Sequence, residues 1–187
     1  MPLGAARFGL GGVDLGKLEL IQTQTVSGTV AQVDFTSIKE STYNVHLLML
    51  SNMVTENDNK RVSLRLFESG TIETGSVYHI ANFVLEAGGS QADVRSTGIS
   101  DLRITDNTGN DTGESSNTYV YLYNLGDSSK YSFITCQSSA ITSSAVGVTE
   151  FGSGVLPQTS TVDGIRVLGD GAINLTGGTM SLYGIKE

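Results

Sequence analysis

The side chains most often used for acid–base and metal chemistry are few in this chain. Its two histidines, His46 and His79, could serve as a general base or as a pair of metal ligands. Both lie among apolar residues in stretches that alternate like β-strands. We therefore predict that both are partly buried strand residues, with the base and metal roles as the alternatives.

An oxygen-rich stretch, "DNTGNDTGESS", holds Asp106, Asp111 and Glu114 at close spacing. Calcium prefers such oxygen donors, so these three carboxylates are weak candidates for a calcium site. The ligand order of an EF-hand and its closing glutamate are missing. Asp, Asn, Thr and Gly are also typical of a long hairpin loop. We predict an ordinary loop and expect no metal and no cofactor.

The sequence gives little support for a catalytic nucleophile. The stretch "FGSGV" around Ser153 lacks the glycine two residues before the serine, and no helix is predicted after it, so it is not a nucleophile elbow. Cys136 is the only cysteine, which excludes an internal disulfide and a cysteine zinc site. We predict that Cys136 is a small buried hydrophobe. No catalytic residue is assigned, and we expect a protein that is not an enzyme.

The stretch "NTYVYLYN" is the most informative one. It places Tyr119, Tyr121 and Tyr123 on one face of a strand, and a hairpin to "KYSFITCQ" would extend that face with Tyr131 and Phe133. Such a candidate aromatic contact face can stack on sugar rings or pack against another subunit while its hydroxyls stay hydrated. The remaining alternative is that these rings line the rim of a packed sheet.

Strands must position all of these side chains. In "RVSLRLF" (residues 61–67), apolar residues alternate with polar ones, which is typical of a half-buried strand rather than a helix. No convincing helical stripe of 11 residues occurs. About nine or ten short strands at regular spacing predict a single antiparallel β-sandwich, jelly-roll-like, which is an all-β fold. Similar alternation marks the stretches 18–25, 29–35, 42–51, 77–84, 101–105, 117–124, 130–137, 162–168 and 179–186.

Turn-forming residues separate these stretches, and they include "EAGGSQ", "NLGDSSK", "EFGSG" and "LTGG". The one change in composition falls after Gly16. Residues 1–16 are glycine-rich yet carry apolar side chains, so we predict a Gly-rich assembly arm (1–16) and a β-sandwich domain (17–187). The arm residues expected to contact a partner are Leu3, Arg7, Phe8, Leu10 and Val13, and the alternative is an arm folded back on its own domain.

The charge balance limits the partners. The formal net charge is −8, and basic residues are not clustered, so nucleic acid and anionic membrane surfaces are not expected partners. No apolar run approaches the ~20 residues of a membrane helix, and the N-terminus lacks a secretory h-region. We expect no membrane insertion and no export by the usual route.

Several stretches resemble small virion-associated proteins of marine tailed phages, and the resemblance spans nearly the whole chain. They are "MPLGAARFGLGGVDLGKLELIQTQTVSG", "FTSIKESTYNVHLLMLSNM", "ETGSVY", "YLYNLGDSSKYSF" and the closing "FGSGVLPQTSTVDGIRVLGDGAINLTGGTMSLYGIKE". The resemblance implies a structural role as a tail-fibre, knob or capsid-decoration protein. It brings no catalytic residues with it.

We therefore expect a non-enzymatic structural subunit on the outside of a tailed-phage virion, attached through its arm and assembled in the bacterial cytoplasm. Its expected partners are other virion proteins and further copies of itself, with a trimer favoured. The alternative is a receptor-recognition module that binds host-surface glycan through the tyrosine face or the 106–116 loop. A glycoside hydrolase rests on fold analogy alone.

Overall fold

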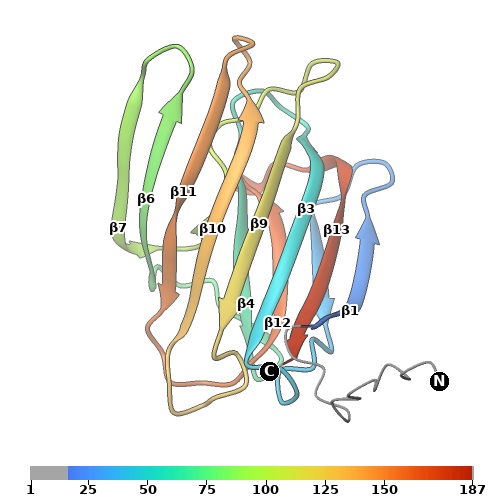
Figure 1. The fold of residues 1–187 in the computed structure, drawn as a ribbon, viewed down its shortest axis with the longest axis vertical. Helices are drawn as coiled ribbons and strands as arrows, with labels where there is room; N and C mark the ends of the chain where they lie inside the picture. Colours follow the sequence, from blue (N-terminus) through green and yellow to red (C-terminus); the bar gives the residue numbers. More distant parts are fainter. Residues whose placement is uncertain (1–16, 187) are drawn as a thin grey trace, which may run out of the picture.

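The computed structural model describes residues 17–186, and they form two antiparallel β-sheets packed against each other. The all-β sandwich expected from the sequence is confirmed, while its jelly-roll connectivity stays a prediction. Figure 1 shows the larger sheet in front, with strands of the smaller sheet behind it. Within the described residues, the only helical element is the short 3₁₀ turn η1 (Asp170–Ala172).

The larger sheet has eight strands, and neighbours in it are hydrogen-bonded. Their order is β1 (Lys17–Thr25), β13 (Leu175–Lys186), β3 (Val45–Thr55), β9 (Ser116–Tyr123), β10 (Ser132–Ile141), β11 (Gly147–Leu156), β6 (Tyr78–Glu86) and β7 (Gln91–Ile99). Strands β9, β10 and β11 form consecutive hairpins, whereas β1 and β13 bring the two ends of the described chain together. The outer edges of this sheet are β1 and β7.

The smaller sheet covers part of the inner face. Its order is β2 (Gln32–Thr36), β12 (Val162–Gly169), β4 (Val62–Glu68) and β5 (Thr71–Ile72), and β8 (Leu102–Arg103) also pairs with β4. In Figure 1, β4 and β12 lie behind the strands β9, β3 and β13.

Strict alternation of side chains creates the two faces of the larger sheet. Along β10, every second residue is buried, as the period of a strand requires, and the residues between them are exposed. The buried set meets the smaller sheet in one apolar core. The largest fully buried side chains of that core are Phe35, Ile38, Leu48, Leu50, Met53, Leu64, Leu66, Tyr78, Leu102, Ile104, Leu122 and Leu125.

Two turn predictions were wrong. The stretch "EFGSG" lies inside β11, and "LTGG" begins β13. Glycine in β11 allows close packing rather than a turn: a Cβ at Gly152 would lie 2.4 Å from the carbonyl oxygen of Ala81, and one at Gly154 would lie 2.5 Å from Leu102. Strands β5 (Thr71–Ile72), β7 and β11 were not predicted, so residues 17–186 form thirteen strands rather than nine or ten.

Candidate functional site on the outer sheet face

The outer face of the larger sheet carries a continuous set of apolar side chains that we call the apolar band. Two rows of register partners form it, and each row crosses at least four strands. The first row is Leu18, Ile185, Val45, Tyr123, Phe133 and Val155. The second is Leu20, Tyr183, Leu47 and Tyr121.

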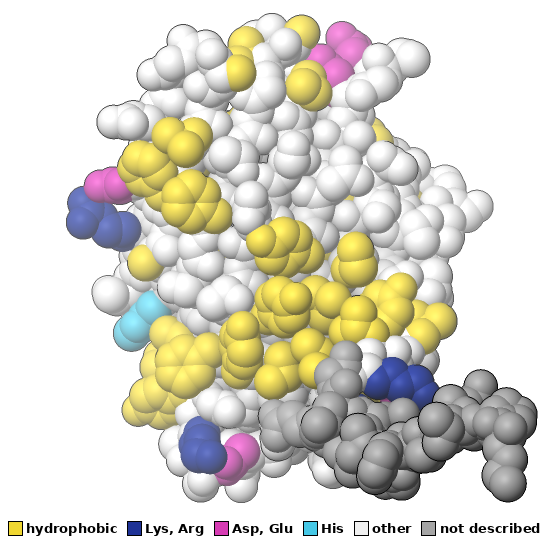
Figure 2. Space-filling view, viewed as in Figure 1, with side chains coloured by type: hydrophobic (Ala, Val, Ile, Leu, Met, Phe, Trp, Pro, Cys, Tyr) yellow, Lys and Arg dark blue, Asp and Glu magenta, His cyan; other side chains and the backbone are white. Residues whose placement is uncertain are grey.

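The apolar band is partly exposed and free of charge: three of its side chains are exposed, most others are half-buried, and Leu47 is buried. Leu18, Leu20 and Phe133 expose 47%, 57% and 44% of their surface. No Lys, Arg, Asp or Glu occurs among the band residues. Figure 2 shows yellow apolar side chains across the lower half of this face and a largely white surface above them. An apolar patch that spans several strands without charge is typical of a protein–protein contact.

The rings of β9 stand in a ladder along the strand. The centroids of Tyr119 and Tyr121 are 6.0 Å apart, edge to face, and those of Tyr121 and Tyr123 are 6.5 Å apart and stacked. The Tyr119 hydroxyl donates to Gln137 Oε1 at 2.6 Å, and the Tyr123 hydroxyl lies 3.2 Å from Thr135 Oγ1. Because β10 holds the hydroxyls of Tyr119 and Tyr123, these two rings are fixed in orientation on the sheet face.

The structure brings most of the predicted aromatic face together. Tyr119, Tyr121 and Tyr123 share the outer face, and Phe133 lies directly opposite Tyr123 on β10. Tyr131 precedes β10 and exposes 44% of its surface.

Sequence reasoning missed the part of the band beyond β9. These residues are Val45 and Leu47 on β3, Tyr183 and Ile185 on β13, and Leu18 and Leu20 on β1. All three stretches were predicted as strands. Their faces could be matched only once β13 was known to pair with both β1 and β3, a long-range pairing that no local pattern reveals.

A third row borders the apolar band and is called the boundary row. It consists of Met49, Tyr119, Gln137, Phe151 and Phe83. Phe83 and Phe151 contact each other at 5.9 Å between ring centroids. Above this row, the next row of register partners consists of Asn117, Ser139 and Thr149, with the exposed Leu85 at its end on β6. The outer face therefore has an apolar zone and a polar zone, with aromatic rings between them.

The two histidines lie on opposite sides of the same sheet. His46 is fully buried on the inner face, where its Nε2–H donates to the Ile38 carbonyl at 2.9 Å, and Nδ1 has no partner among the described residues. His79 is half-buried on β6. The prediction of partly buried strand histidines is thus met at His79, while His46 is more deeply buried than predicted.

Burial makes His46 an acid-sensitive element of stability. Desolvation lowers the pKa of His46, although the Ile38 carbonyl and the Glu40 charge oppose the shift. The unfolded chain takes up this proton near pH 6.5, whereas the folded chain takes it up only at lower pH. The stabilisation is therefore complete above about pH 6.5 and is lost as the pH falls toward the lowered pKa.

We expect His46 to lower the free energy of unfolding by at most about 1.4 kcal/mol between pH 7.5 and 5.5. Urea unfolding at both pH values measures it for the wild type, for His46→Gln and for the control His79→Gln. The His46→Gln protein should show a smaller loss on acidification than the other two. An equal loss in all three proteins contradicts the assignment.

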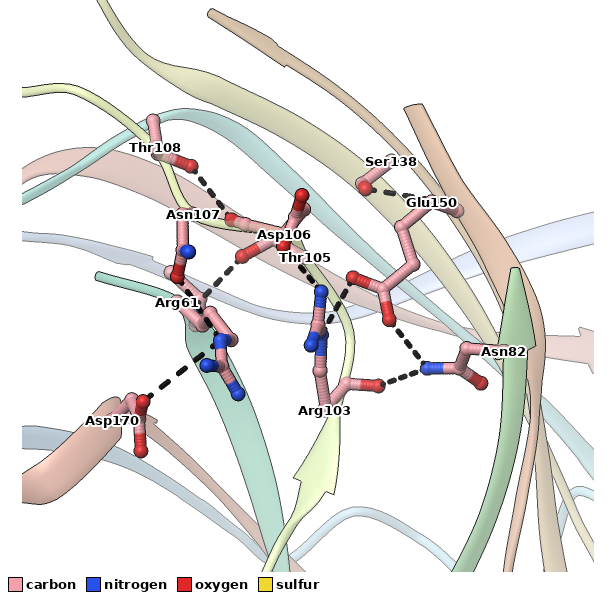
Figure 3. A network of polar contacts seen from close by, with 11 residues as sticks. Arg61, Asn82, Arg103, Thr105, Asp106, Asn107, Thr108, Ser138, Glu150 and Asp170 are labelled. Carbon is pink, nitrogen blue, oxygen red and sulfur yellow. Dashed lines mark hydrogen bonds and ion pairs between the residues drawn. The ribbon is translucent and has the colours of Figure 1, made fainter. Parts of the chain in front are cut away.

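A buried polar network ties three strands together, as Figure 3 shows. Arg103 Nε donates to Glu150 Oε2 at 2.9 Å, and Asn82 Nδ2 donates to Glu150 Oε1 at 2.7 Å and to the Arg103 carbonyl at 3.1 Å. Arg103 also pairs with Asp106. Burial raises the pKa of Glu150, and the charge of Arg103 opposes that shift. Glu150 is fully buried, so this network binds its own strands rather than a ligand.

The three calcium candidates do not converge. Asp106 pairs with Arg103, whereas Glu114 Oε2 accepts from the backbone N–H of Asp111 at 3.1 Å within the loop. Within residues 17–186, no group of three or more His, Cys, Asp or Glu side chains is arranged to hold a metal ion.

Cys136 is buried on the inner face, as predicted. Burial raises the pKa of its thiol to about 12, so the reactive thiolate is scarce at neutral pH. The predicted arm contacts at Leu3, Arg7, Phe8, Leu10 and Val13 lie outside the described residues.

Comparison with protein-family models, curated proteins and solved structures found no match. No helix in residues 17–186 is long and apolar enough to cross a membrane.

Proposed function

We propose that this chain is a non-enzymatic structural subunit on the outside of a tailed-phage virion, and that copies of it assemble through the apolar band. The observation that supports the proposal is the band itself, in which Leu18, Leu20 and Phe133 are exposed, six further apolar or aromatic side chains are half-buried, and no residue is charged. Aromatic enrichment and loss of charge distinguish the cores of protein interfaces from ordinary surface.

The position of the band favours contact between like subunits. It reaches the edge strand β1 through Leu18 and Leu20, so a neighbour could cover the face and lie beside that edge together. An exposed edge with alternating leucines otherwise invites uncontrolled pairing. A closed assembly, for which we favour a trimer, would cover both features at once.

The virion part of the proposal rests on the sequence. The resemblance to virion-associated proteins covers nearly the whole chain, and a net charge of −8 favours solubility at high local concentration. In this proposal, residues 1–16 attach the assembled subunits to a capsid or tail protein. No enzyme activity and no cofactor are part of it.

A matched pair of substitutions tests the apolar band. Leu20→Asp places a charge inside the band, whereas Leu85→Asp makes the same change at another exposed leucine of the same face, outside the band. We expect light scattering to give the wild type and Leu85→Asp three times the chain mass of 19.7 kDa, and Leu20→Asp a single chain. Burying an unpaired carboxylate costs several kcal/mol, which is enough to dissociate a moderate interface.

The same variants test the role in the virion. Particles produced with Leu20→Asp in place of the original chain should carry less of the protein than particles with Leu85→Asp. Equal masses for all three proteins would contradict assembly through the band. Absence of the wild-type chain from purified particles would contradict the virion role, whatever its mass in solution.

A further inference from the structure

The polar zone above the boundary row contains an open trough. It consists of two adjoining hollows of about 600 and 380 Å³, and both are lined by Asn117 and Ser139. The trough runs across the strands rather than along them, because Asn117, Ser139, Thr149 and Leu85 are register partners on four neighbouring strands. An elongated ligand could therefore lie across the sheet.

The floor of the trough offers both hydrogen-bond donors and hydrogen-bond acceptors. Asn117 Oδ1 accepts from the backbone N–H of Asn52 at 3.0 Å, which leaves its amide N–H groups free to donate. The Thr149 hydroxyl donates to the Ser138 carbonyl at 2.6 Å and keeps its lone pairs for a ligand. Within residues 17–186, no hydrogen-bond partner is found for the Ser139 hydroxyl, which faces the trough.

Aromatic rings lie beside the trough in the boundary row: Tyr119 lines the smaller hollow, and Phe151, which lines neither hollow, follows the lining residue Thr149 on the outer face of β11. Tyr119 and Phe151 expose 41% and 43% of their surface. Both are register partners of Gln137, so they lie two strands apart, about 10 Å. That spacing is on the scale of a disaccharide unit. Because Gln137 accepts the Tyr119 hydroxyl proton, its own amide N–H groups are available between the two rings.

The charges select the class of ligand. Glu86 is the one charged residue among those lining either hollow, and the whole chain carries a net charge of −8. Phosphate, sulfate and uronate groups would find no cation there. Hydroxyl and amide groups beside exposed rings instead match the hydroxyls and the apolar C–H faces of a sugar.

We propose that this trough binds a neutral polysaccharide chain lying across β3, β9, β10, β11 and β6. The site is distinct from the apolar band and does not depend on it. Two features singled out in the sequence meet here, because Tyr119 forms one wall and the 106–116 loop contributes Gly113 and Ser115 to the rim. Sugar rings would stack on Tyr119 and Phe151 while Asn117, Gln137 and Ser139 bind their hydroxyls.

Affinity gel electrophoresis of the full chain tests the site. Dextran, mannan and laminarin, cast separately into native gels, are the neutral probes, and heparin is the anionic one. We expect at least one neutral probe to slow the protein and heparin to leave it unaffected. Tyr119→Ala and Phe151→Ala should each weaken retardation about 10-fold, and Ser139→Trp should abolish it by filling the trough.

Tyr131→Ala is the matched control, since Tyr131 is as exposed as Tyr119 but does not line the trough. It should bind like the wild type. The mass of each variant is measured by light scattering, so that a change in assembly is not mistaken for a change in binding. The proposal is overturned if no neutral probe retards the protein, if only heparin does, or if Ser139→Trp binds normally. None of these outcomes bears on the apolar band.

Discussion

Replacing Glu150 by alanine should lower the free energy of unfolding by about 3 kcal/mol, because removing one partner of a buried ion pair leaves the other charge buried without its partner. Arg103 is 8% exposed and would keep only Asp106, while Asn82 would lose its 2.7 Å acceptor. Strands β6, β8 and β11 would all lose a cross-strand contact. Urea unfolding followed by tyrosine fluorescence measures the change, since the chain has seven tyrosines and no tryptophan.

The exposed ion pair between Asp93 and Arg95 provides the control. Asp93→Ala should change the free energy of unfolding by less than about 0.5 kcal/mol. Glu150→Gln should fall between the two, because the amide keeps the shape and one acceptor but loses the charge. If Glu150→Ala were as mild as Asp93→Ala, the network would contribute little to stability.

Gly152→Ala should lower the free energy of unfolding by about 2 to 3 kcal/mol, at the upper end of overpacking effects. Gly152 lies directly opposite Asn82 on the neighbouring strand. A Cβ there would come within 2.3 Å of Asn82 Oδ1 and within 2.6 Å of its Cα. Backbone atoms cannot give way locally, so β11 would have to move away from β6.

Gly147→Ala is the matched control on the same strand, because the nearest atom to its added Cβ is Ala87 Cβ at 3.8 Å. That is an ordinary contact, so the free energy of unfolding should change by less than about 0.5 kcal/mol. The same urea titrations compare the two variants. Equal stability of Gly152→Ala and Gly147→Ala would show that β11 has room to shift.

Local patterns predicted the strands that alternate clearly, but they failed where glycine has a packing role. Residues 61–67 alternate in sequence and form most of β4, whose apolar face is fully buried and whose other face is half-buried at Arg65 and Phe67. The glycines of β11 instead admit Asn82 and Leu102, which lie far away in the chain. A single sequence does not distinguish such a glycine from a turn glycine.

The candidate site was predictable only in part for a related reason. The aromatic residues of β9 and β10 belong to one hairpin, so their common face followed from the period of the strands and the short turn. The rest of the band and the trough depend on which strands lie beside β9 and β11. The placement of β3 and β6 there follows from packing across the whole sandwich.

The two zones of the outer face give the molecule separable surfaces. A neighbouring copy on the apolar band would leave the polar trough open, because the boundary row lies between them. In a closed trimer, each trough would present one site, and a polysaccharide with many repeats could engage several at once. Such multivalent contact strengthens weak individual binding by large factors.

The pairing of β1 with β13 has a consequence for synthesis on the ribosome. Strand β13 supplies the partner of β1 and one of the two partners of β3, yet it is the last of the described strands to be synthesised. Until β13 has been made, β1 has no partner in the sheet and β3 has only β9. We therefore expect this sandwich to fold slowly, since many of its contacts join distant parts of the chain.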